Sequence, residues 1–354
     1  MSALDILSRN GTKKSALDLL SDRTPPVSPQ VQPNLFQELI NRDPYRRGVS
    51  WMGTGDVGSG KTALMVHMIN RLFVHKRQVG RELREGRIDE EARWVYEQIA
   101  AEKVFWIGDA DCQWRRVPNA CTCSAEKLFF VEDGLELKFF LDREPVKIKA
   151  VPFTDFEDVT AYAEPHRLNV VHIRDPLDVM DFIQYLISKS LGEWTSIIVD
   201  EMEDICPAYM REDNWARAQQ FSKRMSRARK ANISFYATLQ SDSQLDWRTP
   251  DIVPYRGLCQ GARRPKGWKV FEWVCGDVPI GQAHIATRAH FQKITYPPYL
   301  ENGTMKVKGL TMWEEIRERT TKAAEKKAEN HKEGLDRGLK TTTPLSKSAE
   351  MGGV

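Results

Sequence analysis

The stretch Gly55-Asp56-Val57-Gly58-Ser59-Gly60-Lys61-Thr62 decides the fold, because it matches the phosphate-binding pattern G-x-x-x-x-G-K-[ST]. A strand-like run, residues 48–52, precedes it. Residues 62–74 follow it with apolar side chains at helical spacing: Leu64, Met65, Met68, Ile69 and Leu72. A strand, a glycine-rich turn and a helix in this order are the context that the pattern requires, so we predict a phosphate-binding loop here.

The residue types of this loop suit a nucleotide. Glycines let backbone N–H groups turn inward around the β-phosphate, and the positive end of the helix dipole faces the same anion. Lys61 would reach the β- and γ-phosphates, and the Thr62 hydroxyl would ligate Mg²⁺. The predicted nucleotide-binding residues are Gly55, Asp56, Val57, Gly58, Ser59, Gly60, Lys61, Thr62 and Ala63.

Two other interpretations compete for these residues. Residues 53–58 also spell G-x-G-x-x-G, the dinucleotide-binding fingerprint. Against it, Lys61-Thr62 follows at the spacing of a phosphate-binding loop, and no second strand ends in an acidic residue about 20 positions later. The remaining alternative is an ordinary glycine-rich turn.

A second motif follows the apolar run Thr195–Val199, which ends in Asp200 and Glu201. Asp200 at a strand tip can hold the Mg²⁺ shell, and Glu201 beside it can orient or deprotonate an attacking water. The plainer alternative is that both acids cap the next helix. Glu203 and Asp204 read as solvated or helix-capping residues rather than catalytic ones.

Short apolar strands alternate with helices, which predicts an α/β fold with a mostly parallel sheet. The strands are expected at 169–173, 195–199 and 233–239, and the helices at 176–191 and 215–230. Residues 77–168 are expected to form a large α+β insertion outside the minimal fold. Residues 257–260 and 269–275 are expected to pair as a hairpin.

The ends of the chain read differently from this middle part. Residues 1–45, with prolines at 25, 26, 29 and 33, predict a flexible arm. The predicted ATPase domain covers 46–305, and residues 306–354 predict a charged helical and flexible tail.

Composition narrows the setting of this 354-residue chain. A formal net charge of +3 is too small to mark a nucleic-acid binder by itself. Six irregularly spaced cysteines in a chain of this size argue against a disulfide framework and favour a reducing compartment. No apolar run approaches the length of a membrane span, and the first ten residues, which are charged and lack an apolar core, are not expected to act as a signal peptide. A cytoplasmic location is expected, or a virion-associated one if the chain is viral.

A family resemblance rests on the basic helix and the strand after it. Arg227-Ala228-Arg229-Lys230-Ala231-Asn232-Ile233 leads into Ser234-Phe235-Tyr236-Ala237-Thr238-Leu239-Gln240. With the phosphate loop and Asp200-Glu201 upstream, this order resembles the HerA/FtsK superfamily of DNA-pumping ATPases, whose core is RecA-like. Residues 241–248 also resemble the Zot-like proteins of filamentous phages. The usual Thr before the Gln is Leu239 here, and Ser241-Asp242 replaces the Arg-Pro that often follows.

The resemblance implies an ATP-hydrolysing DNA translocase of the genome-packaging type, with ATP and Mg²⁺ as cofactors. Gln240 would match a sensor of the γ-phosphate or the attacking water. Members form rings, usually hexamers, in which an Arg completes the neighbour's site; Arg229, then Arg227 and Arg224, are the candidates. Double-stranded DNA and a capsid or membrane protein would be partners. The alternatives are a Zot-like export ATPase and a nucleotide-dependent switch or scaffold that moves no DNA.

Two weaker signals remain. Cys112, Cys121 and Cys123, with Asp109 and Asp111, could bind zinc, but the spacing is not a recognised zinc pattern, so reduced cysteines are expected. The basic residues Arg263, Arg264, Lys266 and Lys269, with Trp268 among them, could contact DNA phosphates and stack on bases. A solvated hairpin tip explains these residues equally well.

Overall fold

The computed structural model describes the backbone of residues 34–42, 48–108, 114, 117, 127–141, 144–146, 149–189, 193–207, 212–240, 252–265, 268, 278–297 and 304–308. The chain divides into two units, Met1–Asn34 and Leu35–Val354. All the elements described lie in the second unit. None of the described helices is both long enough and apolar enough for a membrane crossing.

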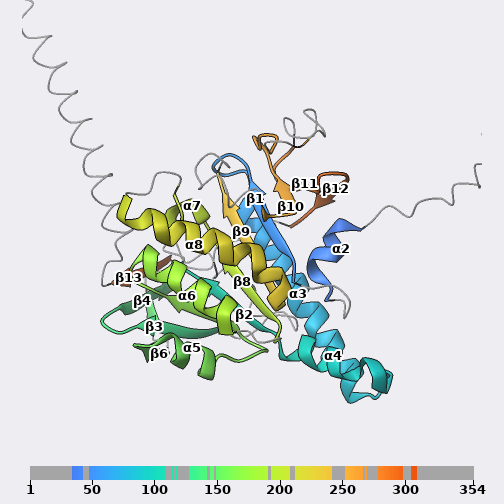
Figure 1. Cartoon of the computed structure of the whole chain (residues 1–354), viewed down its shortest axis with the longest axis horizontal. Coiled ribbons are helices and arrows are strands. Elements are labelled where there is room, and N and C mark those ends of the chain that lie inside the picture. The colour runs from blue at the N-terminus through green and yellow to red at the C-terminus, as the bar shows by residue number, and fades with distance from the viewer. Residues whose placement is uncertain are drawn as a thin grey trace, which may run out of the picture. The chain divides into compact units, whose positions relative to one another are not determined.

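A 10-stranded sheet forms the centre of this unit (Figure 1). Its order is β12 (Phe291–Thr295), β11 (Gln282–Ala286), β10 (Tyr255–Leu258), β1 (Ser50–Thr54), β9 (Ile233–Leu239), β8 (Thr195–Val199), β2 (Lys103–Ile107), β7 (Leu168–His172), β3 (Lys127–Glu132) and β6 (Ala150–Phe153). Every pairing from β10 to β6 is parallel, and β11 and β12 are antiparallel additions at one edge. The predicted α/β class with a mostly parallel sheet is confirmed.

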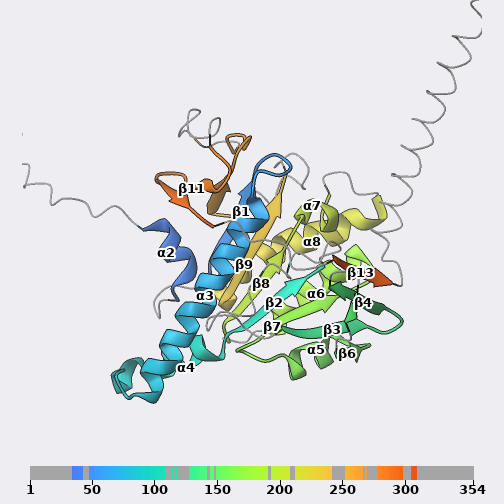
Figure 2. The same cartoon turned by 180° about the vertical axis from the view of Figure 1, so that it is seen from behind.

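Helices cover both faces of the sheet. On one face lie α5 (Phe156–Tyr162), α6 (Pro176–Lys189), α7 (Met202–Ile205) and α8 (Glu212–Ala228), which the short 3₁₀ helix η2 (Arg229–Ala231) follows. On the other face lie α2 (Leu35–Ile40) and α3 (Lys61–Arg84). Figure 1 shows α6 and α8 in front of the sheet, and Figure 2, the view from the opposite side, shows α3 in front of it. Helix α4 (Glu90–Ala101) packs on the C-terminal half of α3.

The two cores follow from the alternation of side chains along each buried strand. On β9, Phe235 and Ala237 face the core beneath α6 and α8, whereas Tyr236 faces the core beneath α3. On β1, Met52 and Trp51 divide in the same way. Because both faces are covered, every residue of these two strands is buried, as is usual for the strands of parallel sheets.

The structure corrects the extent of the predicted insertion, residues 77–168. Helix α3 continues to Arg84, and β2 lies between β8 and β7 in the middle of the large sheet. Trp106 on β2 and Phe130 on β3 are buried in the two cores. Strands β2, β3 and β6 of this segment therefore belong to the central sheet.

The structure also corrects the boundary of the predicted arm, residues 1–45, because α2 packs on the domain. Its four apolar residues Leu35, Phe36, Leu39 and Ile40 are buried, and the Phe36 ring stacks on His67 of α3 at 5.4 Å between centroids. The Tyr236 hydroxyl on β9 donates a hydrogen bond to the Leu39 carbonyl at 2.7 Å. The apolar pairs 35–36 and 39–40 have the spacing of a helix. The prolines before them nevertheless favoured the prediction of a flexible arm.

Arg42, just after α2, is buried in a polar network with Glu102. Its guanidinium donates to the Glu102 carboxylate at 2.9 Å, to Ser196 Oγ at 2.8 Å and to Tyr236 Oη at 3.1 Å. Burial alone would lower the pKa of Arg42, but the charge and hydrogen bond of Glu102 outweigh burial and raise it. Burial would raise the pKa of Glu102, and Arg42 and Lys76 reverse that effect and lower it. The pair is therefore ionised, and it joins the segment after α2 to strand β8.

Two predictions concern the C-terminal part. Of the expected hairpin, residues 257–258 lie in β10, which pairs in parallel with β1 and antiparallel with β11, and residues 269–275 lie outside the described residues. The predicted tail, residues 306–354, begins inside a strand, since β13 (Thr304–Lys308) pairs with β4 (Glu136–Leu141). β13, β4 and β5 (Glu144–Val146) form a second, antiparallel sheet. The rest of the tail lies outside the described residues.

Candidate nucleotide-binding site

The candidate site is built where three neighbouring parallel strands end. β9 lies between β1 and β8, so the ends of these strands lie side by side at one edge of the sheet. The phosphate-binding loop follows β1, Asp200 and Glu201 follow β8, and Gln240 follows β9. The carboxyl edge of a parallel sheet is where α/β proteins place their ligand sites.

Gly60 shapes the turn into α3, whose first residue is Lys61. Its φ of 91° is left-handed, a conformation that glycine adopts without strain. A Cβ at this position would also lie 2.5 Å from the Tyr296 hydroxyl oxygen. Tyr296, after β12, is buried and approaches the Ser59 carbonyl at 3.5 Å. The segment after β12 therefore contacts the loop through Tyr296.

Backbone contacts hold the rest of the loop. The Asp56 N–H donates to the Gln260 carbonyl at 2.9 Å, and the Ser59 N–H donates to the Asp56 carbonyl at 3.1 Å. A Cβ on Gly55 would lie 2.8 Å from that same Gln260 carbonyl oxygen, so the backbone approach requires glycine. Val57 at the tip is 80% exposed, which leaves the outer side of the loop open to solvent.

Lys61 points its ammonium group back over the loop. Nζ donates to the carbonyl oxygens of Gly55 at 2.9 Å and Asp56 at 2.8 Å. These bonds hold the ammonium group of Lys61 against the backbone of the loop. An ammonium has three donors, so Lys61 retains capacity for a further acceptor.

Thr62 and Asp200 meet across the site. The Thr62 hydroxyl oxygen lies 3.2 Å from each carboxylate oxygen of Asp200. Asp200 is buried, and it also accepts a short hydrogen bond from the Thr238 hydroxyl on β9. Hydroxyl and carboxylate oxygens are the hard ligands that Mg²⁺ prefers, so this pair fits a magnesium ion shared with a nucleotide. Among the described residues, no cluster of three or more His, Cys, Asp or Glu side chains forms a metal site by itself.

Glu201 has an unusual backbone, with φ 52° and ψ 61° in the left-handed region. This conformation costs a non-glycine residue about 1–2 kcal/mol. The Glu201 N–H donates to the Thr238 hydroxyl oxygen at 3.1 Å. The plain interpretation of Glu201 as the cap of α7 is weakened, because Glu201 occupies the N-cap position without a side-chain capping bond.

Glu203, which the sequence suggested to be solvated or capping, lies in the site region. Its Oε1 accepts a hydrogen bond from the backbone N–H of Gln240 at 3.0 Å. Burial, assisted by the charges of Asp204 and Glu201, raises the pKa of Glu203 to about 7, although backbone hydrogen bonds oppose the shift. The side chain of Gln240 is exposed at the same strand end.

The sequence did not indicate that Glu203 or Thr238 would belong to the site. The position of Glu203 three residues after Asp200 and that of Thr238 two residues before Gln240 were the available signals. The pairing of β8 with β9 places Val199 opposite Ala237, so the residues that follow Val199 lie beside Thr238 and the end of β9.

The three candidate arginines differ in their surroundings. Arg224 on α8 donates to the Gln184 carbonyl at 3.2 Å and makes a short bond to Ser188 Oγ, so it ties α8 to α6. Arg227 and Arg229 are exposed. Arg229 precedes β9, whereas the candidate site follows β9, and a seven-residue strand spans about 20 Å. Arg229 therefore lies at the opposite edge of the sheet from its own chain's loop.

The dinucleotide interpretation does not fit this geometry. Gly53, the first glycine of that fingerprint, lies inside β1 rather than in the turn after it. A Cβ on Gly53 would lie 2.5 Å from the Trp51 ring, so packing explains this glycine. The helix instead begins at Lys61 and Thr62, as a phosphate-binding loop requires.

The weaker sequence signals fare differently. Trp268 is buried against Leu258, Ala262 and Ala286, so the suggestion that it stacks on bases is wrong. Arg263 and Arg264 are exposed, while Lys266 and Lys269 lie outside the described residues. The suggested zinc ligands Cys112, Cys121 and Cys123, with Asp109 and Asp111, also lie outside them.

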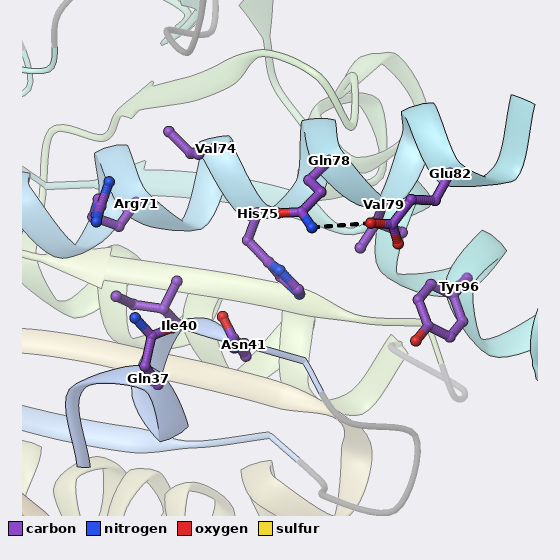
Figure 3. Close-up of a pocket in the computed structure, with 10 residues that line it drawn as sticks. All are labelled: Gln37, Ile40, Asn41, Arg71, Val74, His75, Gln78, Val79, Glu82 and Tyr96. Atoms are coloured by element: carbon purple, nitrogen blue, oxygen red, sulfur yellow. Dashed lines mark hydrogen bonds between the residues drawn. The ribbon is translucent and has the colours of Figure 1, made fainter. Parts of the chain in front are cut away.

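A separate pocket of about 410 Å³ lies between α2, α3 and α4 (Figure 3). Its lining runs from Arg71 to Glu82 along α3, and Gln78 donates to Glu82 there at 2.9 Å. Arg71 lies ten positions after Lys61, which is about 15 Å along a helix. The pocket is therefore distinct from the phosphate-binding loop.

The parallel sheet, the loop between β1 and α3, and the acidic end of β8 together define the architecture of a P-loop NTPase. The sequence matches no protein-family model and no curated protein. The chain resembles the solved genome packaging NTPase B204 from Sulfolobus turreted icosahedral virus 2 in complex with ATP-gammaS, at 10% identity and a TM-score of 0.37, over 73% of this chain and 100% of that one.

Two further solved structures are similar. One is the N-terminal domain of zonular occludens toxin from Neisseria meningitidis, at 13% identity and a TM-score of 0.27, over 75% of this chain and 96% of that one. The other is the cytoplasmic domain of the Type VII secretion ATPase EccC from Thermomonospora curvata, at 9% identity and a TM-score of 0.36, over 73% of this chain and 24% of that one. At these identities and TM-scores, the functional assignment rests on the chain's own residues.

Proposed function

We propose that this chain is an ATPase that couples hydrolysis to the movement of DNA. The contact between Thr62 and Asp200, at 3.2 Å, carries the ATPase part. It brings a residue of the phosphate-binding loop and an acidic strand end into one site, with Glu201 immediately beyond. This combination of a loop for phosphates, hard oxygen ligands and an adjacent carboxylate suits nucleotide hydrolysis.

Each residue has a distinct task in this proposal. The loop N–H groups and Lys61 bind the β- and γ-phosphates, and Thr62 and Asp200 hold a magnesium ion. When bound, this ion neutralises charge on the phosphate oxygens. Glu201 takes a proton from the attacking water, whose oxygen bonds to the γ-phosphorus while the bond to the β–γ bridging oxygen breaks. ADP and phosphate are the products.

The DNA part rests on the resemblance of residues 227–240 to DNA-pumping ATPases. The exposed Arg229 supports an arrangement in which one subunit completes the site of the next, because it lies far from the loop of its own chain. We propose self-association into a ring, with Arg229 in contact with the neighbour's nucleotide. Gln240, exposed beside the site, would sense the γ-phosphate or the attacking water.

An ATPase assay with and without double-stranded DNA tests both parts, with Lys61→Ala as the control for contaminating activity. Hydrolysis that DNA stimulates and that Lys61→Ala abolishes is the expected result. A hydrolysis rate that neither double-stranded nor single-stranded DNA changes would favour a nucleotide-dependent switch or scaffold. The absence of Lys61-dependent hydrolysis under all these conditions would contradict the proposal.

A further inference from the structure

Thr238 joins the two acidic residues at the end of β8. Its hydroxyl makes a short hydrogen bond to Asp200 Oδ1, and its oxygen accepts the N–H of Glu201 at 3.1 Å. The direction of both bonds follows from the partners, because an ionised carboxylate can only accept and a backbone N–H can only donate. One buried hydroxyl therefore contacts both residues.

The position of Thr238 in the sheet gives this contact its importance. β9 lies between β1 and β8, and Thr238 is paired with Gly53, two residues before Gly55 of the loop. On the other side, Asp200 also receives the Thr62 hydroxyl at 3.2 Å. The Asp200 carboxylate is thus held between hydroxyls from α3 and from β9. Removing one of them takes away one of the two hydroxyl contacts that orient the carboxylate.

The Glu201 backbone depends on the same hydroxyl. Its left-handed conformation is unfavourable for a residue with a side chain, and surrounding contacts must hold it. The hydrogen bond from its N–H to Thr238 is such a contact. The direction in which the Glu201 side chain leaves the strand end is therefore linked to the orientation of Asp200.

We propose that Thr238 is a positioning residue, which orients Asp200 for the magnesium ion and Glu201 for the attacking water through a single hydroxyl. This proposal rests on the proposed ATPase function and adds to it a specific dependence. Loss of the hydroxyl uncouples magnesium from nucleotide binding and slows hydrolysis, while the loop continues to bind nucleotide without the metal.

Thr238→Val removes the hydroxyl at nearly constant volume, and Thr238→Ser restores it. Ser234→Ala is the matched control: Ser234 is a buried hydroxyl on the same strand, and its oxygen accepts the Val49 N–H at 3.2 Å, near the other end of β9. A purely structural role for Thr238 would give Thr238→Val and Ser234→Ala the same functional profile. Urea unfolding of each variant shows which of them fold.

Calorimetric binding of ATP-gammaS in EDTA and in Mg²⁺ measures the coupling without turnover. In EDTA, we expect Thr238→Val to bind ATP-gammaS with the affinity of wild type. In Mg²⁺, we expect its affinity to be at least about 10-fold lower than that of wild type, because a hydrogen bond to a charged group is lost. Most of the gain in affinity that Mg²⁺ gives the wild type would then be absent. The kcat of Thr238→Val should fall by a similar factor or more. Thr238→Ser should recover most of both, and Ser234→Ala should retain both.

A Thr238→Val protein that kept the Mg²⁺ gain and the kcat of Ser234→Ala would overturn the role of Thr238 and leave the ATPase proposal intact. If Thr238→Val does not fold, Thr238→Ala is measured in its place, with the same expectations. Wild-type protein that bound no nucleotide would overturn the proposed function and this role together.

Discussion

Thr62 Oγ1 lies 3.2 Å from both carboxylate oxygens of Asp200, although 138 positions separate the two residues in the sequence. The parallel strands β1 and β8, with β9 between them, bring the residues together. The sheet thus assembles the site by bringing the loop and the acidic strand end together.

Substitutions of Asp200 and Glu201 should have different effects, because the two residues have different tasks in the proposed function. Glu201→Gln should bind ATP with Mg²⁺ but hydrolyse it at least ~100-fold more slowly, because general-base catalysis is lost. Asp200→Asn should instead raise the Mg²⁺ concentration needed for half-maximal activity. Titrations of Mg²⁺ with both variants check this division. Full activity of Glu201→Gln would assign water activation to another residue.

The proposed arginine finger can be tested by mixing subunits. Arg229→Ala should bind ATP normally and lose about 10³-fold or more of the hydrolysis rate, as other arginine fingers do. Lys61→Ala subunits retain Arg229, and Arg229→Ala subunits retain the phosphate-binding loop. When the two variants are mixed, part of the activity should return at interfaces where an intact loop meets an intact Arg229.

Arg224→Ala is the matched control, because Arg224 contacts Gln184 and Ser188 of its own chain. We expect it to lose stability and to gain nothing from mixing with Lys61→Ala. Assemblies shown to contain both Arg229→Ala and Lys61→Ala subunits, yet no more active than either alone, would refute the finger role of Arg229.

Glu203 should make stability depend on pH. Because burial raises its pKa in the folded protein from 4.5 to about 7, the folded state binds more protons than the unfolded state between these values. Its contribution therefore favours folding at low pH and is lost as pH rises from about 4.5 to 7. Glu203→Gln stays neutral at every pH. As pH rises over that range, its free energy of unfolding should therefore increase relative to that of wild type, by on the order of 3 kcal/mol at most. Urea unfolding at pH 5 and pH 8 measures this gain, and an equal difference at both would contradict it.

The motifs were predictable because their residues are contiguous in sequence. The loop from Gly55 to Thr62 and the run into Asp200 each contain a strand end together with its chemistry. The central position of β2 was not predictable in this way, since its neighbours β7 and β8 lie far along the chain. The bonds of Thr238 likewise depend on the pairing of β8 with β9, which no local pattern encodes.

The docking of α2 was missed for a similar reason. Its partners Tyr236 and Gln292 come from distant strands, and Arg42 finds Glu102 only after the sheet has formed. From the sequence, the prolines before α2 therefore predicted a flexible arm, although the apolar residues of α2 have helical spacing.

This docking predicts a large stability effect at Arg42. Arg42→Met leaves the buried Glu102 carboxylate without its main cation, which should cost about 3–5 kcal/mol of unfolding free energy. Adding Glu102→Gln removes the uncompensated charge, so the double variant should be more stable than Arg42→Met alone. Urea unfolding compares them. A loss below about 1 kcal/mol for Arg42→Met would show that this segment does not pack on the domain as described.

In the proposed function, the loop from Gly55 to Thr62 binds ATP for hydrolysis through Lys61. The decisive measurement is phosphate release from ATP, compared for wild type and Lys61→Ala of equal folded content. We expect hydrolysis by wild type and a drop of at least ~100-fold in Lys61→Ala, because the charge facing the β- and γ-phosphates is gone. Near-normal turnover by Lys61→Ala would show that the loop does not act in this way.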